Sequence, residues 1–240
     1  MLIDVHAHLD MFNELDSIIN KFPGIIITNS VNLESMQKNL EISKKYKNVK
    51  LAFGVYPLHC LEISEEDLDK QIEFIKENKD KIVALGEIGI DFKENLEREK
   101  QIKNFKKFVS LGEEIKKPII VHSRGACSEI LKLLENVKTK VVLHYFNANT
   151  SLIKKALNLG FYFSVPTNIG TSKNLKKIVK IAPIEKILTE TDCPYLSPIK
   201  GERNEPINVR YTITEISKIK NIAEKEVEER IYKNYLNIFE

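Results

Sequence analysis

The sequence predicts a (β/α)₈ barrel that fills residues 1–240 as a single domain. Eight short runs rich in Ile and Val alternate with longer amphipathic stretches rich in Lys and Glu. Apolar strands that alternate with helices are typical of a parallel sheet whose outer face is covered by helices. Eight such units in 240 residues fit a closed barrel better than an open sheet. An open sheet would carry a glycine-rich phosphate loop after its first strand, where this sequence has His-Ala-His.

The strands and helices are expected in strict alternation. The predicted strands are Leu2–His8, Gly24–Val31, Lys50–Val55, Ile82–Ile90, Pro118–His122, Lys140–His144, Gly160–Val165 and Lys186–Thr191. The predicted helices between them are Phe12–Lys21, Leu33–Tyr46, Ser64–Lys79, Leu96–Lys116, Ala126–Glu135, Thr150–Leu159 and Ser172–Ile181. Two more helices, Ile207–Lys220 and Glu224–Phe239, follow the last strand.

The composition bounds the class of protein. The sequence contains no run of about 18 apolar residues, so we expect no transmembrane helix. The net charge of +3 neither indicates nor excludes a nucleic-acid substrate, because an enzyme that contacts a few phosphates needs only a local basic cluster. The three cysteines, Cys60, Cys127 and Cys193, form no CxxC pair and argue against a disulfide framework or a thiolate zinc site. With no secretory signal either, we expect a cytoplasmic protein.

Metal-binding residue types follow five of the eight predicted strands. A barrel gathers the carboxyl ends of its strands on one face, where active sites lie. Four of the five histidines, one glutamate and one aspartate occupy such ends and should converge. These residues are His6, His8, Glu87, His122, His144 and Asp192.

The first strand gives the most specific signal. Side chains two apart on a strand point to the same side, so His6-Ala7-His8 directs two imidazoles at one point. Imidazole suits Zn, Fe, Ni and Co, whereas carboxylates favour Mg and Mn. The set suffices for two metal ions if one carboxylate bridges them, and Glu87 is the best placed because its strand lies between those of the histidines.

Three further carboxylates stand near these residues. We expect Asp4 and Asp10 to accept hydrogen bonds from imidazole N–H groups, although a turn or cap role is equally open for Asp10. Glu190 shares a strand face with Asp192, so it either supports the site or pairs with a Lys inside the barrel.

The candidate ligands stand in longer segments that form a recognisable series along the chain. The segments are Asp4–Asp10, Gly86–Asp91, Val121–Arg124, Leu143–Phe146, Thr189–Leu196, Arg203–Pro206 and Asn234–Phe239. In these segments the sequence resembles the TatD family of metal-dependent deoxyribonucleases, within the amidohydrolase-like barrels, and the resemblance spans nearly the whole chain, in order.

The resemblance implies a dinuclear metal centre and a substrate. His6, His8, Glu87 and Asp192 would hold one divalent ion, and Glu87, His122 and His144 the second. The ions would be Mg, Mn or Zn and would lower the pKa of a bound water. Asp192 would act as the general base, with Glu87 as the second catalytic carboxylate. The expected reaction is 3′–5′ exonuclease cleavage of single-stranded DNA.

Two residues depart from the family pattern. Tyr56 stands where relatives carry His before Pro, which puts the substrate preference in question. His59 is a substitute for that histidine or an exposed loop residue. Tyr145 stands where relatives often have Cys, which we interpret as a change in pocket shape.

Phosphodiester hydrolysis needs positive charge near the phosphate oxygens. Arg124 lies two residues after His122, and Arg203 lies in the segment after the last strand. Both are candidate phosphate ligands, since Arg binds phosphate in a bidentate manner. A surface ion pair is the alternative for each, and Glu205 is a candidate partner of Arg203.

Two other functions stay open. The same centre could hydrolyse a different ester or amide, such as aminoacyl-tRNA, a lactone or a cyclic amide, because a fold does not fix a substrate. A non-catalytic scaffold is the third possibility, against which the complete set of six candidate ligands argues. The oligomeric state is open, with a monomer favoured, and so is the role in DNA repair, fragment turnover or proofreading.

Overall fold

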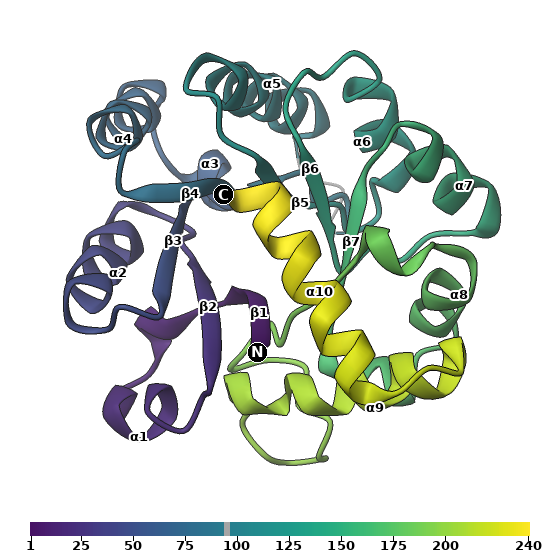
Figure 1. Cartoon of the computed structure of the whole chain (residues 1–240). Coiled ribbons are helices and arrows are strands. Elements are labelled where there is room, and N and C mark those ends of the chain that lie inside the picture. Colours follow the sequence, from purple (N-terminus) through teal and green to yellow (C-terminus); the bar gives the residue numbers. More distant parts are fainter. Residues whose placement is uncertain (94–96) are drawn as a thin grey trace.

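Eight parallel strands form a nearly closed barrel in a computed structural model of the chain, with helices around it (Figure 1). The structure describes residues 1–93 and 97–240. Each strand pairs in parallel with the next one in the chain, as the sequence predicts. The strands are β1 (Leu2–Ala7), β2 (Gly24–Asn29), β3 (Val49–Phe53), β4 (Ile82–Gly89), β5 (Ile119–His122), β6 (Val141–His144), β7 (Tyr162–Val165) and β8 (Ile187–Thr189).

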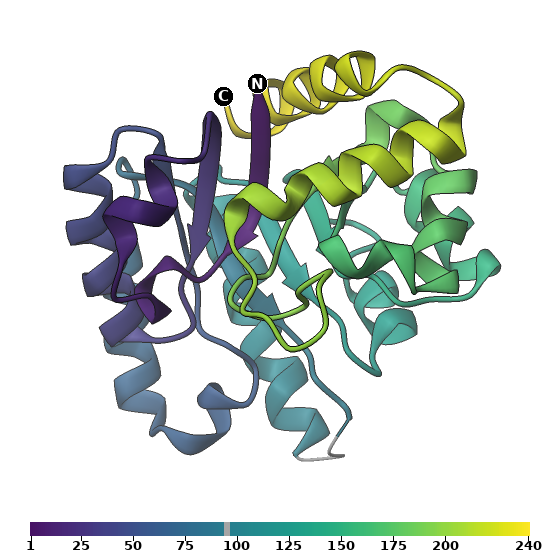
Figure 2. The same ribbon diagram turned by 90° about the horizontal axis from the view of Figure 1, so that it is seen from below.

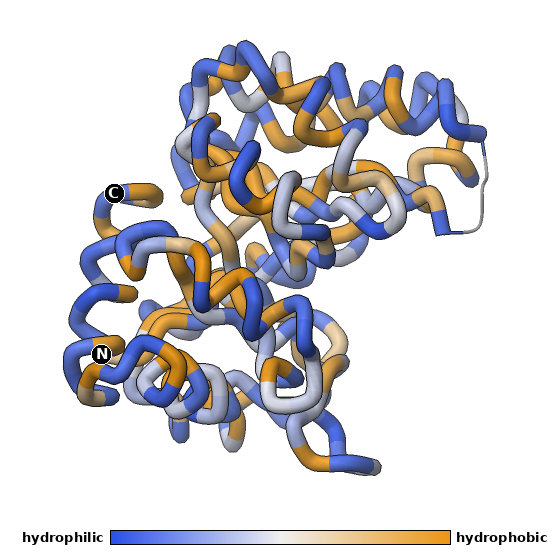
Figure 3. Tube along the Cα trace, turned by 90° about the vertical axis from the view of Figure 1, so that its right-hand side faces the viewer, coloured by the Kyte–Doolittle hydropathy of each residue, from blue (hydrophilic) through white to orange (hydrophobic). Residues whose placement is uncertain are grey.

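The helices surround the strands. They are α1 (Leu15–Ile19), α2 (Leu33–Lys45), α3 (His59–Glu62), α4 (Glu65–Glu77), α5 (Arg98–Glu114), α6 (Cys127–Leu133), α7 (Thr150–Asn158), α8 (Lys173–Ile181), α9 (Val209–Lys220) and α10 (Glu224–Phe239). Short 3₁₀ helices are η1 (Leu9–Met11), η2 (Thr167–Gly170), η3 (Ile184–Lys186) and η4 (Pro206–Asn208). Hydrophobic and hydrophilic residues alternate along the helices, in keeping with one buried face on each (Figure 3).

Side-chain caps fix where several helices begin. Asn32, Ser64, Asn149 and Ser172 each accept a hydrogen bond from the backbone N–H three residues later, at α2, α4, α7 and α8. Such a cap satisfies one of the backbone N–H groups that have no partner in the first helical turn.

The barrel closes between β1 and β8 through side-chain hydrogen bonds and a few backbone hydrogen bonds. Asp4 is fully buried and accepts hydrogen bonds from the backbone N–H and the hydroxyl of Thr191, at 3.0 and 2.6 Å. The backbone N–H of Asp192 donates to the His6 carbonyl at 2.8 Å, and that of His8 to the Cys193 carbonyl at 2.9 Å. These bonds tie the candidate ligands after β8 to those of β1.

Helix α10 lies across the barrel end where β1 begins, beside both chain termini (Figure 2). The Asn234 amide donates to the carbonyls of Ile184 and Ile187, at the start of β8. Tyr235 beside it is fully buried. This end of the barrel is therefore covered, and the carboxyl ends of the strands form the other face.

Several predicted boundaries were wrong. The first helix was predicted over Phe12–Lys21 but covers only Leu15–Ile19, because Phe12 is extended and Pro23 disfavours helical backbone just before it. Helix α5 ends at Glu114 because Lys116 takes a positive φ of 55°. Its predicted first residue, Leu96, lies outside the described residues.

The sequence prediction missed α3, since four residues are too few to show a helical period. Most strands are also one or two residues shorter than predicted. Among residues 1–93 and 97–240, no helix combines the length and the apolar composition that crossing a membrane requires.

Candidate metal centre

Four imidazoles surround the Glu87 carboxylate at the open end of the barrel. His6 and His8 Nε2 lie 3.4 and 3.7 Å from Glu87 Oε2. His122 Nδ1 and His144 Nε2 lie 2.7 and 3.8 Å from Glu87 Oε1. The two carboxylate oxygens thus each face a pair of histidines, with β1 on one side and β5 and β6 on the other. The structure thus brings these five side chains together at this end of the barrel.

Asp192 completes the cluster from the segment after β8. Its Oδ1 lies 3.3 Å from His8 Nε2 and 3.7 Å from His6 Nε2. The side chain is 15% exposed, whereas that of Glu87 is only 5% exposed. Asp192 therefore stands between the buried histidines and the open pocket.

The donor atoms fall into overlapping groups that could each hold an ion. Within each group the candidate donor atoms lie within 4.8 Å of one another. Glu87 belongs to two of the groups, so its carboxylate could be shared by two ions. The groups are His6 with His8 and Glu87, His6 with His144 and Asp192, and Glu87 with His122 and His144.

Three histidines are held by the ring nitrogen that faces away from Glu87. His8 Nδ1 lies 3.0 Å from the Asn29 carbonyl, so this nitrogen carries the proton and donates. His122 Nε2 lies 3.1 Å from Asp91 Oδ2, and His144 Nδ1 lies 2.9 Å from Glu190 Oε2. A metal-ligating histidine commonly donates its second N–H in this way, which fixes the ring and leaves the inner lone pair for the ion.

His6 gives an independent test of whether the residues fit a metal. Its side chain is fully buried, and neither ring nitrogen has a hydrogen-bond partner among the described residues. A buried polar atom without a partner costs about 1–3 kcal/mol. A cation beside Nε2 would satisfy that atom, so the donor set fits a metal centre.

The pKa values describe a site that attracts cations. Burial would raise the pKa of Glu87, but the hydrogen bond to His122 and the charges of the neighbouring His122 and His6 rings hold it well below its usual range. Burial would lower the pKa of His8, yet Asp192 raises it to about 9. In the same way Glu190 outweighs burial and raises the pKa of His144 to about 10. Without metal, protons therefore take the place of cations between these carboxylates.

Metal uptake should release protons. At pH 7 the metal-free protein holds protons on His8 and His144, because both pKa values lie above 7. Since an ion binds only the neutral imidazole, we expect at least two protons to leave on loading, and affinity to fall as the pH is lowered. Titration calorimetry with Mn²⁺ or Zn²⁺ in buffers of different ionisation enthalpy measures this number. Equal heats in every buffer would contradict the expectation.

Two predicted roles of nearby carboxylates were wrong. Asp4 accepts from the backbone N–H of His6 at 3.2 Å and from Thr191, not from an imidazole. Asp10 accepts from the Asn39 amide at 3.3 Å, while the ring of His8 bonds to a backbone carbonyl. Asp4 is thus held by a backbone N–H and by Thr191, and Asp10 by the side chain of Asn39.

The alternatives for Glu190 are settled by its contacts. It accepts from His144 Nδ1 at 2.9 Å and from the backbone N–H of Tyr145 at 3.1 Å. It therefore supports the site by holding His144.

Asp91 is the residue that the sequence prediction missed. It is fully buried and accepts from the Tyr56 hydroxyl at 2.8 Å and from Arg124 Nε at 2.7 Å, besides facing His122. These three groups outweigh burial and depress the pKa of Asp91. Its place four residues after Glu87, just beyond β4, was the available signal.

Glu87 and Arg124 line an open cavity of about 590 Å³. The cavity is also lined by the predicted substrate residues Tyr56 and His59. His59 stands on α3, not in an exposed loop, with Nδ1 3.4 Å from Glu62 Oε2. Arg124 forms an ion pair, with Nη2 2.6 Å from Asp91 Oδ2, and its side chain is 46% exposed at the cavity wall.

Arg203 does not reach this cavity. Its Nη2 pairs with Glu14 Oε2 at 3.2 Å, and its guanidinium lies 4.4 Å from the centre of the Phe12 ring. Arg203 thus forms a surface ion pair, with Glu14 rather than Glu205 as the partner.

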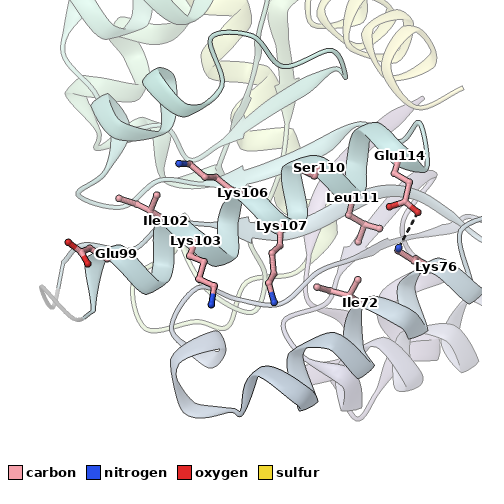
Figure 4. A pocket seen from close by; sticks show the side chains of 10 residues that line it. All are labelled: Ile72, Lys76, Glu99, Ile102, Lys103, Lys106, Lys107, Ser110, Leu111 and Glu114. Carbon is pink, nitrogen blue, oxygen red and sulfur yellow. Dashed lines mark ion pairs between the residues drawn. The ribbon is translucent and has the colours of Figure 1, made fainter.

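A second hollow, of about 660 Å³, lies on the outer surface between α4 and α5 (Figure 4). Three of its four lysines pair with acidic residues, with Lys103 2.5 Å from Glu65, Lys107 3.0 Å from Asp69 and Lys76 3.0 Å from Glu114. These ion pairs join the two helices, so this hollow is not a candidate anion site.

Comparisons with known proteins place the chain in a family. The sequence model of the family described as TatD related DNase matches residues 3–240. An uncharacterized metal-dependent hydrolase of Methanocaldococcus jannaschii is 39% identical over 244 residues, which cover 99% of this chain and 96% of that protein. Deoxyribonuclease TATDN3 of Homo sapiens is 31% identical over 258 residues, with coverages of 99% and 94%. The crystal structure of a TatD family hydrolase from Entamoeba histolytica superposes with a TM-score of 0.88 at 27% identity, over 99% of this chain and 97% of that one. This chain therefore belongs to the TatD family of metal-dependent hydrolases.

Proposed function

We propose that this hydrolase removes nucleotides from the 3′ end of single-stranded DNA, using two divalent ions. The proposed ligands are His6, His8, Glu87 and Asp192 for one ion, and Glu87, His122 and His144 for the other. The observation that carries the proposal is the arrangement of four imidazoles around one buried carboxylate, with Arg124 at the rim of the same cavity. The relatives named deoxyribonucleases support DNA as the substrate.

Divalent ions in this site would supply Lewis acidity toward the phosphate and a lowered pKa for water. The chain's own residues divide the remaining tasks. Asp192 stands at the mouth of the cluster, where its carboxylate can accept a proton from the attacking water. Arg124, oriented by Asp91, would hold a phosphate oxygen and neutralise developing charge. Glu87 would hold the four imidazoles in position around its carboxylate.

The primary test compares the cleavage of the same DNA sequence labelled at its 5′ end or at its 3′ end. Protein is stripped of metal, reloaded with Mg²⁺, Mn²⁺ or Zn²⁺ in turn, and given single-stranded DNA labelled at the 5′ or the 3′ end. We expect a metal-dependent ladder from the 5′ label and early release of single labelled nucleotides from the 3′ label. Release of nucleotides from the 5′ label first would reverse the polarity, and internal fragments alone would indicate an endonuclease.

The two arginines should respond differently to truncation. Arg124→Ala removes a cation from the cavity wall and should lower kcat/KM on DNA about 10- to 100-fold. Arg203→Ala removes a half-exposed ion pair with Glu14 and should stay within about twofold of wild type. Steady-state rates on a short oligonucleotide measure both. Equal losses would place Arg203 in substrate binding and contradict this assignment.

A second substrate class is favoured by Tyr56. Its hydroxyl donates to Asp91 and lies 3.5 Å from His122 Nε2, so a phenol occupies the cavity wall beside the proposed ions. The same centre could then act on another ester or on an amide, such as aminoacyl-tRNA, a lactone or a cyclic amide. Comparing kcat/KM between DNA and such a panel separates the two classes. Turnover of a panel member without any nucleotide release would replace the nuclease proposal.

We further propose that residues 1–240 form one domain and that the protein works as a cytoplasmic monomer. Light scattering of the purified protein and imaging of a tagged copy in its host cell test these points. Protein that cannot take up metal at micromolar concentration would instead favour a non-catalytic scaffold.

A further inference from the structure

A third hollow, of about 830 Å³, adjoins the metal cavity on the face where β7 and β8 end. It lies between η2, the segment after β8 and α9. The two hollows share a wall, because Leu196 lines the metal cavity and Ser197 lines the neighbouring hollow. Across this wall the Asn168 amide donates to the Tyr145 hydroxyl at 3.1 Å, and each of these two residues lines one of the hollows.

The walls of this hollow carry an excess of positive charge. Lys200 and Arg210 are exposed, and neither forms an ion pair within the part of the chain that the structure describes. Glu215 already pairs with Lys218 at 2.8 Å and faces Lys176 at 3.5 Å. In the hollow between α4 and α5, by contrast, acidic residues pair with three of the four lysines, Lys76, Lys103 and Lys107. Figure 4 shows the pair of Lys76 with Glu114.

Exposed aromatic and apolar side chains gather around the same two hollows. Tyr195 is 52% exposed and lines the metal cavity together with Met11, and Tyr211 is 47% exposed and lines the neighbouring hollow. Exposed Ile199 stands in the segment between them. Aromatic faces beside unpaired cations are the features with which proteins bind single strands, because bases stack on the rings and cations contact phosphates.

We propose that this hollow binds single-stranded DNA on the 5′ side of the nucleotide that is cleaved. Tyr211 stacks on a base, and Lys200 and Arg210 contact successive phosphates. The strand then passes over Tyr195 into the metal cavity. This inference rests on the proposed nuclease function and extends it from the scissile bond to the rest of the strand.

Binding tests the inference without catalysis. Fluorescence anisotropy of a 5′-labelled dT₁₂ is followed with metal-free protein in chelator. Tyr211→Ala should weaken binding about tenfold, whereas Tyr211→Phe keeps the ring and stays within about twofold. The double change Lys200→Ala and Arg210→Ala should reduce the salt dependence of log Kd by about 1.4, at about 0.7 for each phosphate contact on a single strand. The exposed pair Lys180→Ala and Lys225→Ala is the matched control and should leave the slope unchanged.

Substrate length separates this inference from the nuclease proposal. The reloaded Tyr211→Ala enzyme should lose about tenfold in kcat/KM on dT₁₂ and stay within about twofold on the dinucleotide d(TpT), which is too short to reach the hollow. Wild-type values on both substrates would overturn the hollow as a DNA site and leave the nuclease intact. Equal losses on both would also overturn it, since they indicate damage to the metal cavity. If the wild-type enzyme cleaves neither substrate, the nuclease proposal fails. The binding measurement alone then decides whether the hollow binds single-stranded DNA.

Discussion

Glu87→Gln should abolish hydrolysis and lower the metal content of the purified protein. The substitution keeps the shape of the side chain and removes the charge that faces all four imidazoles. Because Glu87 belongs to two donor groups, its loss weakens both proposed sites together. We expect kcat to fall on the order of a thousandfold or more. Metal analysis of the dialysed protein and the rate on labelled DNA measure the two effects.

Two further variants sharpen this prediction. Glu73→Gln changes an exposed glutamate on α4 and should match wild type in metal content and rate. Glu87→Asp keeps the charge but withdraws it from the histidines, so it should retain part of the metal and little of the rate. Circular dichroism of each variant shows whether the barrel is folded. A folded Glu87→Gln protein with normal turnover would remove Glu87 from the centre.

Gly89→Ala should destabilise the barrel strongly. Gly89 has a φ of +152°, and a Cβ there would lie 2.1 Å from the carbonyl oxygen of His122. The two residues are paired between β4 and β5, so the clash separates the strands that carry Glu87 and His122. Strain in the backbone and displacement of the neighbour together should cost on the order of 3 kcal/mol. Urea denaturation of the metal-free protein measures the change in the free energy of unfolding.

Gly160→Ala is the matched control for this strain. Gly160 also has a positive φ, of +80°, but nothing lies within 4 Å of an added Cβ. Its substitution should therefore cost only the backbone strain, about 1 kcal/mol. Equal losses in the two variants would show that the contact with His122 contributes nothing to the destabilisation of Gly89→Ala.

The sequence predicted the barrel and the convergence of the six candidate ligands because both follow from simple periodicities. Apolar runs fix the strands, and parallel strands in a barrel bring their carboxyl ends together whatever their distance in sequence. The spacing of two between His6 and His8 likewise fixes their common direction. These inferences need only the direction of the backbone.

The partners of the ligands could not be predicted in the same way. Asp91, Asn29 and Glu190 each hold one histidine, but which of them reaches which ring depends on strand register and on irregularities. Register shifts occur within the β1–β2 and β4–β5 pairs, next to the site. The ion-pair partner of Arg203 could not be predicted for a related reason, because Glu14 lies far away in sequence and meets Arg203 only in the folded chain.

The most direct test of the dinuclear nuclease counts ions and cleavage in one titration. Metal-free protein receives Mn²⁺ in steps, and bound ions per chain and the rate of nucleotide release from single-stranded DNA are measured in each sample. We expect binding to saturate near two ions per chain, with activity rising as the second ion binds and both signals lost in Glu87→Gln. Full activity with one ion or none, or two bound ions without any nucleotide release, would contradict the proposed dinuclear nuclease.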